Sequence, residues 1–103
     1  MHRRLNSYIL IAALLAPSSV LAQDQALVEA GAEVYQTHCA ECHGDRLVNP
    51  GSSFDLKRLG ADERPRFDTS VANGKGQMPA WGGVLGSDDM DRLWAYIRSR
   101  ADR

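Results

Sequence analysis

Residues 39–43 read Cys39-Ala-Glu-Cys42-His43, a C-x-x-C-H pattern that holds the only two cysteines among 103 residues. On a helical turn, two thiols three positions apart lie on one side and both reach the vinyl groups of one porphyrin edge. The imidazole that follows at once would then lie under the iron as its proximal ligand. This pentapeptide is the attachment signature of haem c, and it predicts one covalently bound haem per chain.

The same pentapeptide has three other interpretations. A dithiol redox pair of the thioredoxin kind requires a βαβ context, which the surrounding pattern lacks. Half of a zinc site requires further Cys or His ligands, yet the only other histidine after residue 22 is His38. An ordinary structural disulfide is the third. Haem c is the leading interpretation, and a dithiol–disulfide oxidoreductase without haem is the main alternative.

Residues 1–22 have the layout of a secretory signal peptide. Two arginines come first, an uncharged stretch runs from Tyr8 to Ala16, and small residues occupy the end of Val20-Leu21-Ala22. We expect Pro17-Ser18-Ser19 to end any helix. The apolar run is much shorter than the ~20 residues of a membrane span. Cleavage is therefore expected rather than retention as a membrane anchor, and it leaves residues 23–103 as one exported, periplasmic domain.

Size and charge restrict what such a domain can do. The chain carries 12 basic and 13 acidic residues, and loss of residues 1–22 leaves 10 basic and 13 acidic ones, a net charge of −3. This balance argues against a nucleic-acid binder, which needs a clustered basic surface. The 81 remaining residues make a hydrophobic core alone marginal, so a cofactor that fills the centre is expected.

The apolar periodicity predicts an all-α fold. Helices are expected over residues 26–39 and 61–72, with Asp62 as the N-cap of the second, and a short helical turn over 54–59. The last helix begins at Ser87 as N-cap and carries an apolar stripe. No alternating strand pattern of useful length is present.

Met78 is the expected second axial ligand, opposite His43. It lies 35 residues after His43 in a loop rich in glycine, Gly74–Pro79, long enough to pass around the haem edge. Proline restricts the backbone beside it, and His/Met is a known pair of haem ligands. Other candidates are Met90, expected in the core, His38, tethered on the attachment side, and the lysines Lys57 and Lys75.

Three segments of the chain resemble the class I monohaem cytochromes c, namely residues 31–44, 73–81 and 93–98. The resemblance covers nearly all of residues 23–103. It implies the cytochrome c fold, three to four short helices around one covalently bound haem. It also implies that the first and last helices cross tightly, with Gly31 packed against Tyr96 and Tyr35 joining the contact.

The chain departs from that family after the haem motif. Many members have a Gly-Pro-x-Leu stretch whose proline carbonyl orients the proximal histidine. Here the chain reads Val48-Asn-Pro50-Gly-Ser-Ser-Phe54. Pro50 is the expected counterpart of that proline, while Phe54 and Leu56 are candidates for the haem wall.

The resemblance implies a monomeric one-electron carrier rather than an enzyme, because two filled axial positions leave no open site at iron. Segments 54–59 and 74–81 suggest a quinoprotein alcohol dehydrogenase as partner, and a terminal oxidase is the other candidate. We expect no nucleic-acid partner and no stable membrane insertion after cleavage. If Met78 did not bind, five-coordinate iron would instead suit a haem enzyme or a gas sensor.

Overall fold

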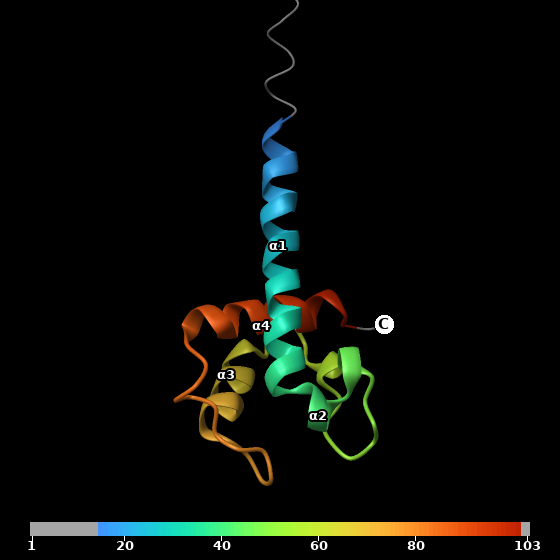
Figure 1. The fold of residues 1–103 in the computed structure, drawn as a ribbon, viewed down its shortest axis with the longest axis vertical. Helices are drawn as coiled ribbons and strands as arrows, with labels where there is room; N and C mark the ends of the chain where they lie inside the picture. Colours follow the sequence, from blue (N-terminus) through green and yellow to red (C-terminus); the bar gives the residue numbers. More distant parts are fainter. Residues whose placement is uncertain (1–14, 102–103) are drawn as a thin grey trace, which may run out of the picture.

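The computed structural model describes residues 15–101, and every regular element in that range is helical (Figure 1). Its only pairing of extended backbone is one isolated bridge between Lys75 and Met78. The elements in chain order are α1 (Leu15–His38), α2 (Ala40–His43), the 3-10 turns η2 (Asp45–Leu47) and η3 (Leu56–Arg58), α3 (Arg64–Asn73) and α4 (Ser87–Ser99). The predicted all-α fold is confirmed.

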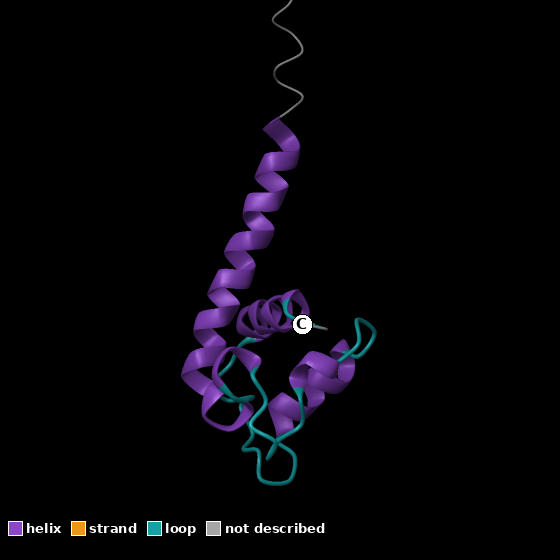
Figure 2. Ribbon diagram, turned by 90° about the vertical axis from the view of Figure 1, so that its right-hand side faces the viewer, coloured by secondary structure: helices purple, strands orange, loops and turns teal. Residues whose placement is uncertain are grey.

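Helix α1 begins earlier than the sequence predicts. The expected break at Pro17–Ser19 is wrong, because the helix already starts at Leu15. A proline in the first turn is tolerated there, since its missing N–H would have no partner within the helix. The first turns project from the helical body, and side chains 19–27 are exposed (Figure 2). The rest of the predicted signal peptide, residues 1–14, lies outside the described residues.

Among residues 15–101, none of the helices combines the length and the apolar content needed to cross a membrane.

Helices α1 and α4 cross (Figure 1), and Gly31 lies at the crossing, as the resemblance implied. A Cβ on Gly31 would lie 1.9 Å from the Arg92 carbonyl oxygen and 2.9 Å from the Cβ of Tyr96. Only a residue without a side chain permits this approach of two backbones. The rings of Tyr35 and Tyr96 then pack with their centroids 5.4 Å apart.

The core gathers around this crossing and along the apolar stripe of α4. Met90 and Trp94 pack against it from the same helix, partly buried. Helix α4 starts at Ser87, so the N-cap is Gly86 rather than the predicted Ser87. The Asp89 carboxylate accepts the Gly86 N–H at 3.3 Å and closes the first turn. Within the described part of the chain, eight apolar side chains are buried: Tyr35, Leu47, Leu59, Phe67, Leu85, Leu93, Tyr96 and Ile97.

Helix α3 begins at Arg64, three residues after the start of the predicted range 61–72. Its N-cap is Glu63 and not Asp62, and Pro65 lies in its first turn. The Glu63 carboxylate accepts the N–H of Gly60 at 2.8 Å. This bond spans the turn that precedes the helix, and it explains why the start moves past Asp62.

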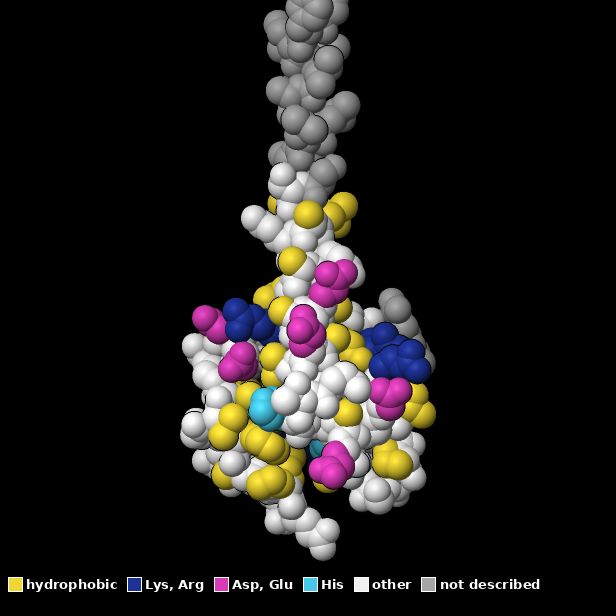
Figure 3. All heavy atoms as spheres, viewed as in Figure 1, with side chains coloured by type: hydrophobic (Ala, Val, Ile, Leu, Met, Phe, Trp, Pro, Cys, Tyr) yellow, Lys and Arg dark blue, Asp and Glu magenta, His cyan; other side chains and the backbone are white. Residues whose placement is uncertain are grey.

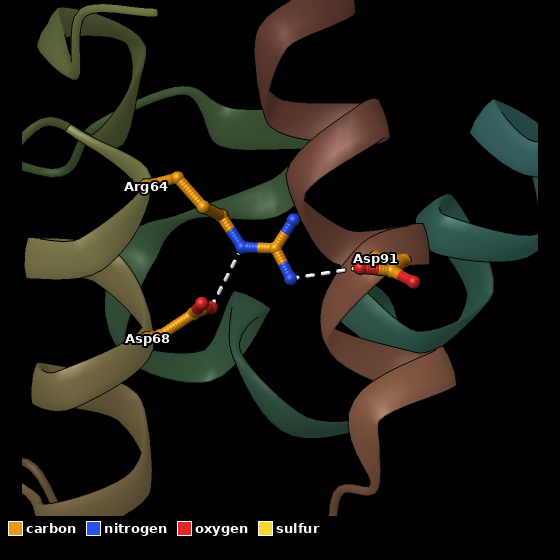
Figure 4. Close-up of polar contacts among 3 residues, drawn as sticks. All are labelled: Arg64, Asp68 and Asp91. Carbon is orange, nitrogen blue, oxygen red and sulfur yellow. Dashed lines mark hydrogen bonds and ion pairs between the residues drawn. The ribbon is translucent and has the colours of Figure 1, made fainter. Parts of the chain in front are cut away.

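Arg64 ties α3 to α4 (Figure 4). Its guanidinium donates to Asp68 one turn along α3 and to Asp91 of α4, each at 2.8 Å. The hydrogen bond to Asp68 is the main cause that raises the pKa of Arg64, and the hydrogen bond to Asp91 is the second. The arginine thus holds α3 at a set distance from α4, which carries three of the eight buried core residues.

Candidate haem site

All four residues that the sequence predicts to bind haem line one cavity. It has a volume of about 730 Å³, and Cys39, Cys42, His43 and Met78 all border it. This volume suits a large organic cofactor. Half of the eighteen other lining residues are apolar. These come from η3, α3, α4 and the loops beside them: Phe54, Leu56, Leu59, Phe67, Val71, Pro79, Trp81, Leu93 and Ile97. A flat apolar porphyrin fits such a lining, and the expected wall residues Phe54 and Leu56 are among its members.

His43 is held with one ring nitrogen free. It ends the single turn of α2, where its N–H donates to the Cys39 carbonyl at 3.0 Å. Its Nδ1 lies 3.1 Å from the carbonyl oxygen of Phe54. A carbonyl only accepts, so Nδ1 carries the proton and Nε2 keeps the lone pair that a metal requires. Such a partner fixes the ring orientation and raises the basicity of the ligand.

The residue that orients His43 is therefore Phe54, and the expectation for Pro50 is wrong. The loop between them is closed by hydrogen bonds from the Asn49 amide to the Ser53 carbonyl, 3.0 Å, and from the Ser53 hydroxyl to the Cys42 carbonyl, 2.9 Å. These bonds bring residue 54, not residue 50, to the imidazole. The sequence does indicate that Phe54 takes the place of the proline in Gly-Pro-x-Leu. A leucine lies two residues after Phe54, as it does after that proline.

Gly44, directly after His43, permits the sharp turn out of α2. Its φ is +99°, a conformation that favours glycine, and a Cβ there would lie 1.8 Å from the Val48 carbonyl oxygen. The Tyr35 hydroxyl donates to the Gly44 carbonyl at 2.5 Å. Burial is the main cause that raises the pKa of Tyr35 far above its usual range. Sequence reasoning assigned Tyr35 to packing alone and missed this bond.

Met78 reaches the cavity from a short hairpin anchored on α3. Lys75 and Met78 exchange two backbone hydrogen bonds, 3.1 and 3.0 Å. After this hairpin, the Trp81 N–H donates to the Val71 carbonyl at 2.8 Å. This bond fixes the segment that follows Met78 to the end of α3. The side chain is thus presented to the cavity by backbone that is held on both sides.

Comparison with known proteins agrees with this geometry. Residues 26–97 match the family described as cytochrome c oxidase, cbb3-type, subunit III. The chain belongs to the cytochrome c family. It is a small monohaem c-type cytochrome, its cofactor is a covalently bound haem c with its iron, and its activity is electron transfer to and from redox partners.

Relatives of this cytochrome include whole small proteins and part of a larger enzyme. It is 35% identical to a cytochrome c6 of Rippkaea orientalis, over 92% of this chain and 86% of the relative. It is 33% identical to a cytochrome c6 of Microcystis aeruginosa, over 71% of this chain and 96% of the relative. It is 30% identical to quinohemoprotein alcohol dehydrogenase ADH-IIG of Pseudomonas putida, over 79% of this chain and 12% of the enzyme. No solved structure gives a significant match.

The thiols of the cytochrome do not suit a dithiol oxidoreductase. Cys39 and Cys42 are both free, the first partly buried and the second exposed. Burial, and next the neighbouring Cys42, raise the pKa of Cys39 to about 11. Reactive redox thiols have a lowered pKa, because the thiolate is the nucleophile. The zinc alternative also lacks support, since residues 15–101 hold no cluster of three or more Cys, His, Asp or Glu arranged for a metal.

The other candidate ligands are distributed around the cytochrome. Met90 packs against the core, as expected, and Lys57 is outside the cavity wall. Lys75 and His38 do line the cavity. The His38 ring meets the Trp81 ring edge-on at 5.1 Å, a contact between the end of α1 and the chain after Met78 that sequence reasoning missed.

Proposed function

We propose that this cytochrome is a periplasmic one-electron carrier with haem c attached to Cys39 and Cys42 and ligated by His43 and Met78. The observation that carries the proposal is the convergence of these four side chains on one apolar cavity. The hydrogen bond from His43 Nδ1 to the Phe54 carbonyl supports it, because Nε2 is left available to iron.

Haem c supplies an iron centre that gains or loses one electron. Cys39 and Cys42 would hold the porphyrin covalently beside α2, and the Phe54 carbonyl keeps the His43 ring from rotating. The soft thioether of Met78 favours the ferrous state, and the apolar wall excludes water, so both raise the reduction potential. If His43 and Met78 both bound the iron, no coordination position would stay open for oxygen or peroxide. The protein therefore carries electrons rather than catalysing a reaction.

The partners are redox proteins that dock transiently at the opening of the cavity. We propose a quinoprotein alcohol dehydrogenase as electron donor or a terminal oxidase as acceptor. The similarity to a stretch of the Pseudomonas putida enzyme supports the first, and the description of the matching family supports the second. Figure 3 shows acidic and basic side chains interspersed over the described part of the face that carries α1. This mixed charge suits a monomeric carrier and gives that face no broad basic area for nucleic acid.

We further propose that residues 1–22 are removed on export. Side chains 19–27 of α1 are exposed, so cleavage after Ala22 would leave the core and the cavity intact. Mass spectrometry of the periplasmic protein should find Gln23 as its first residue. An N-terminus at Met1 in the periplasmic fraction would overturn this part of the proposal.

Visible spectroscopy of the purified protein tests the ligands. Low-spin bands in both redox states and a far-red methionine–iron transition in the ferric state are expected. Met78→Ala should abolish the far-red band, whereas Met90→Leu, the matched control in α4, should keep it. A band that survives in Met78→Ala contradicts the distal ligand. A high-spin spectrum that shifts with carbon monoxide would favour a sensor, and absence of a Soret band would exclude all haem functions.

A further inference from the structure

Phe54 has a demanding position for a loop residue. Its carbonyl is the acceptor for His43 Nδ1–H, yet its side chain is 45% exposed and is not buried in the core. It precedes η3 and has no proline ring to restrict its backbone. Something other than core packing must therefore hold this residue against the imidazole.

The hydrogen bonds of Ser53 hold the loop before Phe54, and Arg66 of α3 adds a contact to the Phe54 side chain itself. The Arg66 guanidinium carbon lies 5.0 Å from the centroid of the Phe54 ring, within the range of a cation–π contact. Both side chains line the cavity. The contact therefore joins the loop before η3 to helix α3 beside the candidate haem site.

The arginine is itself well placed to act as a fixed point. The residue after it, Phe67, is buried in the core, and Arg64 on the same helix is bonded to α4. The Arg66 guanidinium also donates to the Glu63 carboxylate at 3.0 Å, which restricts its rotamers. Helix α3 is thus anchored, and Arg66 extends from it over Phe54 with limited freedom.

We infer that Arg66 is a positioning residue for His43, which acts by holding Phe54 so that its carbonyl stays on the imidazole Nδ1–H. The inference rests on the proposed function, in which His43 is the proximal iron ligand. The hydrogen bond from Nδ1 makes the imidazole more basic and stabilises the ferric state. Loss of the Arg66–Phe54 contact weakens that hydrogen bond. The ferric state is then less stable, and this effect, taken by itself, raises the reduction potential.

The potential by itself is an ambiguous readout. Replacement of Arg66 also removes a positive charge near the iron, which lowers the potential. Solvent exchange of the His43 Nδ1 proton reports on the hydrogen bond directly, and a double-mutant cycle cancels the effect of charge. We would compare wild type, Arg66→Gln, Phe54→Leu and the double variant as ferrous holoproteins, with proton NMR for exchange and voltammetry for the potential.

Each single variant should exchange the Nδ1 proton about two- to fivefold faster, the factor to which an exposed cation–π contact corresponds. The double variant should be no faster than Phe54→Leu, because the contact is already lost. Arg58→Gln is the matched control, since it removes an exposed arginine from η3 and leaves the contact intact. It should exchange like the wild type. The potential should respond to Arg66→Gln by different amounts in the wild-type and Phe54→Leu backgrounds.

Three results would overturn the inference: unchanged exchange in Arg66→Gln, effects that multiply in the double variant, or equal acceleration in Arg58→Gln. Failure of the proposed function has a different signature. If His43 does not bind iron, its ring protons in the wild type will lack the large upfield shifts of an axial imidazole. The exchange comparison can still be made in that case, so the two failures are distinguishable.

Discussion

The Tyr35 hydroxyl of α1 donates a hydrogen bond of 2.5 Å to the carbonyl oxygen of Gly44, the residue that follows His43 in the chain. The same tyrosine packs its ring on Tyr96 of α4. One side chain therefore links the helix crossing that organises the fold to the turn that positions the proximal histidine. Tyr35 is fully buried and Gly44 is partly buried, which limits the access of water to this bond.

Tyr35→Phe tests this bond while it keeps the ring. We expect the free energy of unfolding to fall by about 1 kcal/mol, and by up to about 3 kcal/mol if the Gly44 carbonyl finds no other donor. Urea denaturation of the holoprotein measures the change. Tyr96→Phe is the control, since it removes the hydroxyl group of the tyrosine that packs against Tyr35. Wild-type stability in Tyr35→Phe would show that the bond contributes nothing.

The same residue predicts weakening in alkali. Burial raises the pKa of Tyr35 in the folded state, while the unfolded chain retains an ordinary tyrosine pKa near ~10. Above that pH the unfolded state loses its phenol proton and the folded state keeps it, so the free energy of unfolding falls as pH rises. Burial raises the pKa of Tyr96 as well, so it adds to the slope. Denaturation measured at increasing pH should show a smaller slope in Tyr35→Phe, and an identical slope would contradict the assignment.

Gly31→Ala should loosen the crossing of α1 and α4. The new Cβ would lie 1.9 Å from the Arg92 carbonyl oxygen, which belongs to backbone and has little freedom to move. Overpacking of this kind costs about 1–3 kcal/mol or more, only partly offset by the ~1 kcal/mol advantage of Ala within a helix. Thermal unfolding measures the loss. Gly83→Ala is the control, because a Cβ there meets no atom within 4 Å. Equal stability of the two variants would contradict the tight crossing.

The residue types of the haem motif made the site predictable from the sequence. The backbone acceptor of His43, the hydrogen bond of Tyr35 and the contact of His38 with Trp81 were not predicted. The C-x-x-C-H motif and the loop of Met78 led to residues that share one cavity, and Gly31 marked the helix crossing. The carbonyl of Phe54 has no signature in its own side chain, since any residue offers a carbonyl. Pro50 was therefore the visible but wrong choice.

Helix ends show the same limit. Asp62 and Ser87 have good capping side chains, but Glu63 and Gly86 occupy the cap positions. In both cases a carboxylate accepts the N–H of the glycine three residues before it. Glu63 accepts from Gly60, and Asp89 accepts from Gly86. These bonds reach across a turn, so single-residue capping preference does not predict them. Pro17 likewise suggested a break, whereas its place in the first turn makes it harmless.

The cavity itself predicts that the fold depends on its cofactor. A space of about 730 Å³ borders Phe67, Leu93 and Ile97, which are core residues. A chain this small has little other apolar burial with which to offset the entropy of folding. A group that binds only the folded state stabilises it, so its loss should leave the chain largely unfolded. Cys39→Ala/Cys42→Ala, prepared without haem, should show weak helical circular dichroism and no cooperative urea transition. The wild-type holoprotein is the reference for both signals, and a cooperative transition in the double variant would show that the helices form a stable core without the porphyrin.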